Sequence, residues 1–599
     1  MFDWSKRSGV WVWGVGSVWT LCALLGLASW ATAPTALADE NPRPAVARDV
    51  LTVDVTGQRG GRLVVGLRAE PKTFNPVLAR DNPSRTVIRR LVADLVHIDR
   101  VSQDTGPALA KSWTVSEDGR RFRVELRRGL RFSDGHPLDA DDVVFTFQVY
   151  LDPAIGSPNR DLLVIDDKPL AVRRVDAHTV ELELGGPYAV GDRLFDSIAI
   201  LPKHRLEKAY AAGTFTEVWG LGTAPEEIVG LGPFRLKEYA PGERVILERN
   251  PHYWKVDRRG QPLPYLDELV FLFVGSPEAQ VLRFKNGDTH VVDGLGAEDF
   301  ALLEGDAARR NYRLEDLGPG LSYSFLVFNA NPAPEGSELA HKQTWFRQKA
   351  FRQAISRVID RQSIVRLVYR GRATPSVGPE SAGNKLWLNR ELKPLARSPE
   401  AATRLLGEAG FVRRDNGSWA DATGKPLKLN LVTSSSNSQR LRMATIIQED
   451  LRKFGIPTQV VPMEFRALVE RLLETFDYEV CLLALGGADS DPNGVMGTWL
   501  SSGGNHFWHL GQTSPATPWE AEIDRLMTQQ LVTLDYGERK ALYDRVQRIA
   551  AEQLPFIFLV SPNVLVGARQ GLGNFKPAIL DHPTLWNVEE LHWQGTGGR

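Results

Sequence analysis

Alternation of apolar and polar residues predicts short strands along the first half of the chain. Residues 112–127 (SWTVSEDGRRFRVELR) form a hairpin pattern, with apolar residues at every second position of the second arm and a turn at Glu117-Asp118-Gly119. Two further hairpins are predicted at 171–184 and 234–250, and a first strand at 62–67.

Helical periodicity dominates from Thr344 onward. Before that point, residues 138–151 open with acidic side chains, which suit a helix N-terminus, and continue with an apolar face. Short strands are expected at 290–293, 428–432 and 478–485. Further helices are expected at 279–286, 344–359, 399–409, 437–454, 464–476, 517–533 and 536–552. This mixture predicts an α/β protein of at least two lobes.

The N-terminal segment has the pattern of a secretory signal. Lys6 and Arg7 precede the uncharged apolar run 10–27, and the small residues of Ala36-Leu37-Ala38 follow. We therefore predict cleavage after Ala38 and export to the periplasm. The alternative is an uncleaved anchor, because the run is close to the length that spans a bilayer.

Lipid attachment is not expected, because Leu21 rather than Gly or Ala precedes Cys22. Cleavage after residue 38 of 599 would leave 561 residues, enough for two or more domains. Cys481 would then be the sole cysteine, which rules out an internal disulfide and thiolate metal clusters. Residues 39–60, with two prolines and scattered charges, are predicted to form a flexible linker.

The charge balance gives no sign of a nucleic-acid partner. The whole chain has a net charge of −1, and removal of Lys6, Arg7 and Asp3 with the leader would make it −2. Charges of both signs are interspersed, whereas nucleic-acid binding needs a basic face.

The stretch 486–494 (GGADSDPNG) offers several chemistries. A calcium loop that starts at Asp489 would need a bidentate glutamate at its twelfth position, where Leu500 stands. Asp491 followed by Pro492 is typical of a helix N-cap with proline at the first helical position. Asp489 follows a run that reads as a buried strand, and ligands bind in open α/β sheets where strands end.

No motif supports an enzyme. The sequence contains no G-x-S-x-G elbow, H-E-x-x-H helix or phosphate-binding loop, and no cofactor is expected. His506 and His509 stand three apart without an evident third ligand, so we predict no metal site. For Trp499 and Trp508 two interpretations stay open, namely core packing and an aromatic wall against a ligand, and we carry the second as a site prediction.

Several blocks of sequence resemble one protein family. Residues 107–147 (PALAKSWTVSEDGRRFRVELRRGLRFSDGHPLDADDVVFTF) are similar to the hallmark segment of the extracellular solute-binding proteins of the oligopeptide, dipeptide and nickel type, which serve ATP-driven importers. Further similar blocks follow in the family's order, at 229–254, 279–295, 346–379 and 400–411.

The resemblance implies a two-lobed periplasmic-binding-protein clamshell of the class II-like, three-subdomain type. The first lobe would be discontinuous, with the β-rich subdomain 91–225 inserted in it, and the second lobe would span 321–556. The segments of the first lobe would be 61–90, 226–320 and 557–599. Ligand would bind between the lobes and favour their closure.

The resemblance also implies a peptide site. In the family's peptide binders an Ala-Asp pair anchors the ligand's α-ammonium group, and Ala488-Asp489 matches it. The main chain of Leu485, Gly486 and Gly487 would pair with the extended peptide. Only Ser490 separates the two acids, where the family often has two residues, so Asp489 as a loop-capping residue stays open.

The implied function is a monomeric peptide-binding protein that delivers its ligand to ABC permease subunits. The alternatives are a nickel chelate, an opine or an oligosaccharide as ligand, or a secreted chaperone or scaffold without transport.

Overall fold

The computed structural model describes residues 48–486 and 490–595. The predicted signal segment, residues 39–47 of the predicted linker and residues 487–489 lie outside these ranges. The rest of the predicted linker is described, and it contains strand β1 (Leu51–Val53), which pairs in parallel with β13 (Lys255–Asp257). In the described part of the chain, no helix is both long and apolar enough to cross a membrane.

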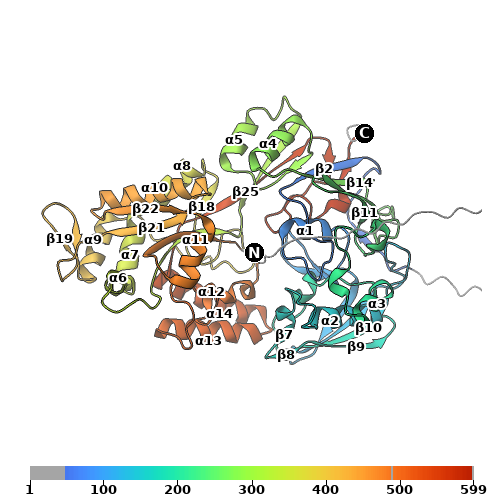
Figure 1. The fold of residues 1–599 in the computed structure, drawn as a ribbon, viewed down its shortest axis with the longest axis horizontal. Coiled ribbons are helices and arrows are strands. Elements are labelled where there is room, and N and C mark those ends of the chain that lie inside the picture. Colours follow the sequence, from blue (N-terminus) through green and yellow to red (C-terminus); the bar gives the residue numbers. More distant parts are fainter. Residues whose placement is uncertain (1–47, 487–489, 596–599) are drawn as a thin grey trace, which may run out of the picture. The chain divides into compact units, whose positions relative to one another are not determined.

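The largest sheet joins segments from both ends of the chain (Figure 1). Its strand order is β11-β12-β14-β2-β15-β25-β16, and β18 pairs with β25. The strands are β2 (Arg62–Leu67), β11 (Phe234–Ala240), β12 (Arg244–Arg249), β14 (Glu268–Phe273), β15 (Val291–Val292), β16 (Tyr312–Pro319), β18 (Ala373–Pro375) and β25 (Val560–Arg569). The helices α4 (Pro277–Asn286) and α5 (Ala297–Glu304) follow β14 and β15 in the chain.

A four-stranded antiparallel sheet is built from two of the predicted hairpins, in the order β5-β6-β10-β9. The strands are β5 (Ala110–Val115), β6 (Arg121–Leu126), β9 (Ala171–Asp176) and β10 (Thr179–Glu183). Helix α2 (Ala140–Leu151) begins as its acidic start predicts, because Asp139 and Asp142 form a reciprocal capping box. Helices α1 (Asn82–Ile88) and α3 (Lys203–Ala211) and the short strand β3 (Val96–Ile98) lie in the same half of the chain.

A five-stranded sheet organises the second half of the chain, in the order β22-β21-β23-β17-β24. The strands are β17 (Tyr323–Phe328), β21 (Leu429–Ser434), β22 (Thr458–Met463), β23 (Val480–Leu485) and β24 (Phe556–Phe558). The helices that accompany it are α6 (Glu338–Phe346), α7 (Lys349–Val358), α8 (Arg361–Val368), α9 (Pro399–Glu408), α10 (Ser438–Lys453), α11 (Phe465–Glu470), α12 (Met496–Trp499), α13 (Pro518–Val532) and α14 (Tyr536–Gln553).

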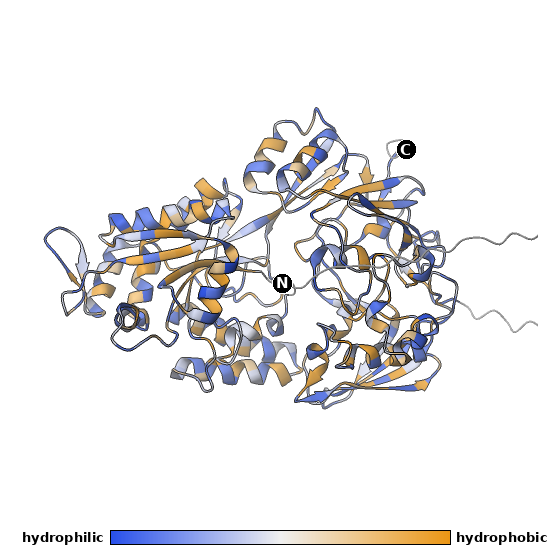
Figure 2. Ribbon diagram, in the orientation of Figure 1, coloured by the Kyte–Doolittle hydropathy of each residue, from blue (hydrophilic) through white to orange (hydrophobic). Residues whose placement is uncertain are grey.

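This sheet carries an apolar core on each face. On β17, Leu326 and Phe328 belong to one core, whereas Phe325 and Val327 belong to another, as the two-residue period of a strand requires. Every residue of β17 is buried, which is typical of a strand covered on both faces. Figure 2 shows the strands largely orange, whereas the helices are divided between orange and blue.

Two predicted helices have different bounds in the structure. The helix expected at 344–359 is two helices, α6 and α7, that meet at Arg347 and Gln348. Arg352 donates from Nη1 to the carbonyl of Phe346 (2.7 Å) and so satisfies a carbonyl at the end of α6. The helix expected at 464–476 consists of α11 and a π-helical turn, Arg471–Thr475.

Candidate functional site

The predicted peptide site lies at the end of β23. Leu485 is the last residue of this strand and is half-buried, and Gly486 after it is exposed. The other main-chain and anchor residues of the prediction, Gly487, Ala488 and Asp489, lie outside the described residues.

The carboxyl end of β23 is paired on one side. Its antiparallel register with β17 runs along the whole strand and ends at Tyr323 opposite Leu485. On its other side, the parallel register with β21 ends with Val432 opposite Cys481. Among the described strands, β17 alone therefore pairs with residues 483–485, and the other side of this main chain has no strand partner in the described part of the chain.

Asp491 caps a helix, as the sequence predicts. Its side chain accepts from the amide of Asn493 (2.9 Å) at the start of a 3₁₀ turn that opens with Pro492. Arg539 of α14 donates to both oxygens of the same carboxylate, at 2.8 and 2.7 Å. Both side chains are less than 5 % exposed, so this is a buried bidentate ion pair. It fixes the chain two residues after Asp489.

The buried side chain of Asn384 holds Ser490 through its main chain. The side-chain amide of Asn384 donates to the carbonyl of Ser490 (2.8 Å) and to Oε2 of Glu380 (2.7 Å). The hydroxyl of Tyr543 donates to the other oxygen of Glu380. Burial raises the pKa of Glu380 to about 7; the hydrogen bonds from Tyr543 and Asn384 oppose the rise, and the charge of Asp491 adds to it.

Stability should therefore depend on pH through Glu380. A folded-state pKa above the ordinary value of 4.5 means that the folded protein keeps a proton that the unfolded chain has lost. The contribution of this group to the free energy of unfolding should thus fall as pH rises from about 4.5 to about 7, by up to about 3 kcal/mol. Urea unfolding of the parent protein and of the Glu380→Gln variant, at several pH values between 5 and 8, measures this contribution.

The difference in free energy of unfolding between Glu380→Gln and the parent should rise with pH across this window, because the amide does not titrate. The matched control is Glu449→Gln, since the pKa of exposed Glu449 is lowered to about 2 by Arg452 and it does not titrate above pH 5. A difference for Glu380→Gln that stays flat with pH would contradict the raised pKa.

The two tryptophans of the site prediction lie in the core beneath the sheet. Trp499 is 1 % exposed and Trp508 is 5 % exposed. The indole nitrogen of Trp508 donates to Glu520 (2.9 Å), and Trp508 is among the residues that line a cavity of about 150 Å³. Nothing in this placement tests a ligand contact, which stays a prediction for both residues.

The paired histidines do not belong to any group of three possible metal ligands in the described residues. His506 faces Glu520, with 3.2 Å between Nε2 and Oε1. Trp508, Thr517 and Gln512 also donate hydrogen bonds to this carboxylate. Burial alone would raise the pKa of Glu520, but the four contacts together lower it to about 2. Within residues 48–486 and 490–595 no three histidine, cysteine or acidic side chains are grouped as metal ligands.

Sequence reasoning missed the residues that support the loop. Glu380, Asn384, Arg539 and Tyr543 are isolated polar positions in the sequence, and Arg539 lies 48 residues from its partner. A charged residue on the apolar side of a predicted helix, as Arg539 is on α14, is the one signal that points to a buried partner.

Comparison with known protein families identifies the family of this chain. Residues 104–507 match the family described as "Bacterial extracellular solute-binding proteins, family 5 Middle". The chain belongs to this family. As a family 5 solute-binding protein of the ABC transporter type, it is a binding component and not an enzyme. The match also confirms the resemblance on which the site prediction was built.

Similar proteins extend over most of the chain. The oligopeptide-binding protein AppA of Bacillus subtilis is 28% identical over 547 residues, which are 89% of this chain and 92% of AppA. The substrate-binding protein CtaP of Listeria monocytogenes superposes with a TM-score of 0.73 at 24% identity, over 90% of this chain and 100% of CtaP. NikA of Brucella suis, solved with Fe(III)-EDTA, has a TM-score of 0.72 at 23% identity, over 89% of this chain and 100% of NikA. The fold is thus that of the two-lobed periplasmic binding proteins, as the sequence predicts.

Proposed function

We propose that this protein binds peptides in an extended conformation beside β23. The observation that carries the proposal is the side of residues 483–485 that has no strand partner among the described residues, where a peptide can pair with the main chain as an added strand. Main-chain pairing gives affinity that does not depend on the peptide's side chains. The similarity to AppA, named as an oligopeptide-binding protein, supports this class of ligand.

Asp489 is the proposed anchor of the peptide's α-ammonium group. A desolvated ammonium group needs a full countercharge, because an unpaired buried charge costs several kcal/mol. The contacts of Ser490 with Asn384 and of Asp491 with Arg539 hold the chain immediately after Asp489. A loop-cap role for Asp489 is the alternative, and the Asp489→Asn variant distinguishes the two.

The proposed lobes are the ones that the resemblance implies, with residues 91–225 inserted in the first lobe and residues 321–556 as the second. Gln103 of the inserted segment donates to the carbonyl of Gly383 (3.2 Å) and accepts from the amide of Lys385 (3.1 Å). The next residue of the second lobe, Asn384, holds Ser490. We propose that these contacts couple closure of the lobes to the loop that carries Asp489.

The proposed setting is the periplasm, after cleavage behind Ala38, with the protein acting as a monomer that delivers peptides to permease subunits. The family is one of extracellular solute-binding proteins, which agrees with an exported chain. A gene neighbourhood that encodes permeases and ATPases would distinguish transport from a scaffold role.

Titration calorimetry with short peptides of increasing length tests the proposal. We expect binding of unmodified peptides, and N-acetylation should weaken it by about a hundredfold or more, because the acetylated amine carries no charge to pair with Asp489. Acetylation of a lysine side chain in the same peptide is the matched control and should have little effect. Failure of every unmodified peptide to bind would overturn the proposal.

A metal chelate is the second candidate, because the NikA neighbour was solved with Fe(III)-EDTA. Removal of metal with a chelator should then abolish ligand binding, whereas a peptide site should be indifferent to this treatment.

A further inference from the structure

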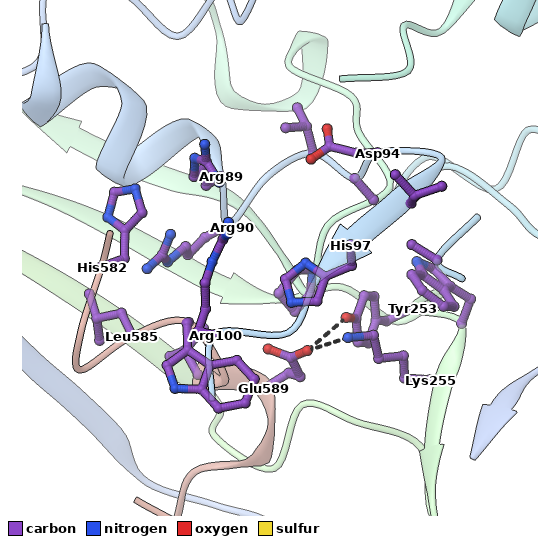
Figure 3. A pocket seen from close by; sticks show the side chains of 18 of the residues that line it. Arg89, Arg90, Asp94, His97, Arg100, Tyr253, Lys255, His582, Leu585 and Glu589 are labelled. Carbon is purple, nitrogen blue, oxygen red and sulfur yellow. Dashed lines mark hydrogen bonds and ion pairs between the residues drawn. The ribbon is translucent and has the colours of Figure 1, made fainter. Parts of the chain in front are cut away.

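A pocket of about 100 Å³ lies where segments distant in sequence meet. Its walls come from the residues that follow α1, from β3, from the start of strand β13 (Lys255–Asp257) and from the C-terminal segment of the described chain. Figure 3 shows Arg89, Arg90 and His582 on the side of the pocket opposite Tyr253 and Lys255.

Arg90 is buried in this wall without hydrogen-bond acceptors for two of its nitrogens. Its side chain is 4 % exposed, and neither Nε nor Nη2 has a partner among the described residues. Glu589, the acid that Figure 3 shows nearest the centre of the pocket, is already engaged by Lys255 (2.7 Å) and by the hydroxyl of Tyr253 (3.3 Å). A buried guanidinium group with unmet donors is costly unless an acceptor reaches it.

Cationic and acidic side chains both line the pocket around Arg90. The cations are Arg89, Arg100 and Lys255, and the acids are Asp94, Asp581 and Glu589. Arg89 has no ion pair in the described part of the chain. Arg100 forms an ion pair with Asp196, with 3.4 Å between Nη2 and Oδ2. Burial and the nearby arginines hold the pKa of His582 well below its usual range, so this ring is neutral. Burial, assisted by Arg89, lowers the pKa of Arg90 to about 9, which leaves it cationic at neutral pH.

Arg352 is a buried arginine of the same protein whose donors do have acceptors. It is 7 % exposed, and its Nε and Nη1 donate to the carbonyls of Gln553 (2.9 Å) and Phe346 (2.7 Å). Four other arginines of the described chain each leave one buried nitrogen, Nε, without a hydrogen-bond partner, namely Arg120, Arg310, Arg313 and Arg569. Arg90 differs from them because two nitrogens of the same guanidinium group lack a hydrogen-bond partner among the described residues.

We propose that the pocket binds a small oxyanion, such as a phosphate, sulfate or carboxylate group, with Arg90 as its central ligand and Arg89 beside it. Guanidinium groups offer several N–H donors in a plane, which suits oxyanions, and a site screened from water strengthens the pairing. The lining residues do not include the β23 site, so this inference does not depend on peptide binding.

Thermal unfolding of the purified chain in sodium phosphate, against sodium chloride of equal ionic strength, tests the site. We expect Tm to rise with the logarithm of phosphate concentration, because phosphate binds the folded state. Fluorescence of Trp254 and Trp586, which line the pocket, should report the same titration. Absence of any effect beyond that of chloride, in sulfate and acetate as well as in phosphate, would overturn the proposal.

The Arg90→Met variant separates a binding role from a structural one. Its affinity for phosphate should fall at least about tenfold, as expected for the loss of one charged hydrogen bond. Its Tm in chloride should be equal to or above that of the parent, because an unsatisfied buried charge has been removed. A variant that keeps the phosphate response would contradict the assignment.

Two further variants keep the test decisive. Arg352→Met should lower Tm in both salts and retain the phosphate response, because its guanidinium group serves the fold. Arg89→Gln should weaken phosphate severalfold with little change of Tm in chloride, and it tests the site if Arg90→Met fails to fold.

Competition between phosphate and a peptide shows whether the oxyanion is a free ion or part of the peptide. If it is a free ion, phosphate and a peptide should bind together without mutual effect. If it is the terminal carboxylate of the peptide, which rests on the proposed function, phosphate should compete with the peptide and amidation of the peptide's C-terminus should weaken its binding.

Discussion

Replacement of Asp491 by alanine is expected to lower the free energy of unfolding by about 3–5 kcal/mol. The change removes both oxygens that accept from Arg539 and leaves this guanidinium group, 3 % exposed, without a countercharge. Its remaining acceptors are neutral oxygens of Asn493 and Gln530, and its cation–π contact with Trp387 does not compensate a buried charge. Urea unfolding monitored by tryptophan fluorescence measures the loss.

Two comparisons identify the ion pair as the cause. The double variant Asp491→Ala/Arg539→Met should recover a substantial part of the lost stability, because no unpaired charge remains buried. Glu449→Ala, which breaks the exposed pair with Arg452, should cost no more than about 1 kcal/mol. An effect of Asp491→Ala as small as that of Glu449→Ala would show that the buried pair does not hold this loop.

Replacement of Asp489 by asparagine is expected to weaken peptide binding by about 2–5 kcal/mol, or roughly 30-fold to several-thousandfold. Asparagine keeps the size of the side chain and one acceptor oxygen but removes the charge that the buried ammonium group requires. Titration calorimetry with an unmodified peptide measures the change. Asp415→Asn, at an exposed position outside the proposed site, is the matched control and should bind like the parent.

A cycle with an N-acetylated peptide shows whether the charge of Asp489 and the ammonium group act on each other. If they do, N-acetylation should weaken binding to the parent strongly and to Asp489→Asn only slightly, so that the two changes are far from additive. Unchanged affinity in Asp489→Asn would remove this residue from the site and leave it the role of a loop cap.

Local patterns were enough to predict the elements that local residues determine. The hairpin 112–127 appears with its turn between β5 and β6, and α2 starts where its acids predict, because alternation, turn residues and capping act within a few residues. The break between α6 and α7 was not predictable from such signals. It involves the side chain of Arg352 at the carbonyl of Phe346, a contact that depends on how the two helices pack.

The same distinction applies to the site. The cap at Asp491 depends on its immediate neighbours and was predicted, whereas its ion pair with Arg539 depends on the packing of α14 and was not. The sequence did indicate that β23 would end at the proposed site, but which side of the strand has no strand partner among the described residues follows from the registers with β17 and β21. These registers join β23 to residues more than 150 positions away in β17 and 49 positions away in β21, and pairing over such separations leaves no mark in either segment.

Native mass spectrometry of the protein, purified from the exported fraction without a denaturing step, tests the central claim most directly. A peptide-binding protein should carry a set of adducts that resolve on dissociation into short peptides, and their masses would give the accepted lengths. A single discrete adduct that is not a peptide would contradict the claim, and it would assign Asp489 to the loop instead of to the ligand.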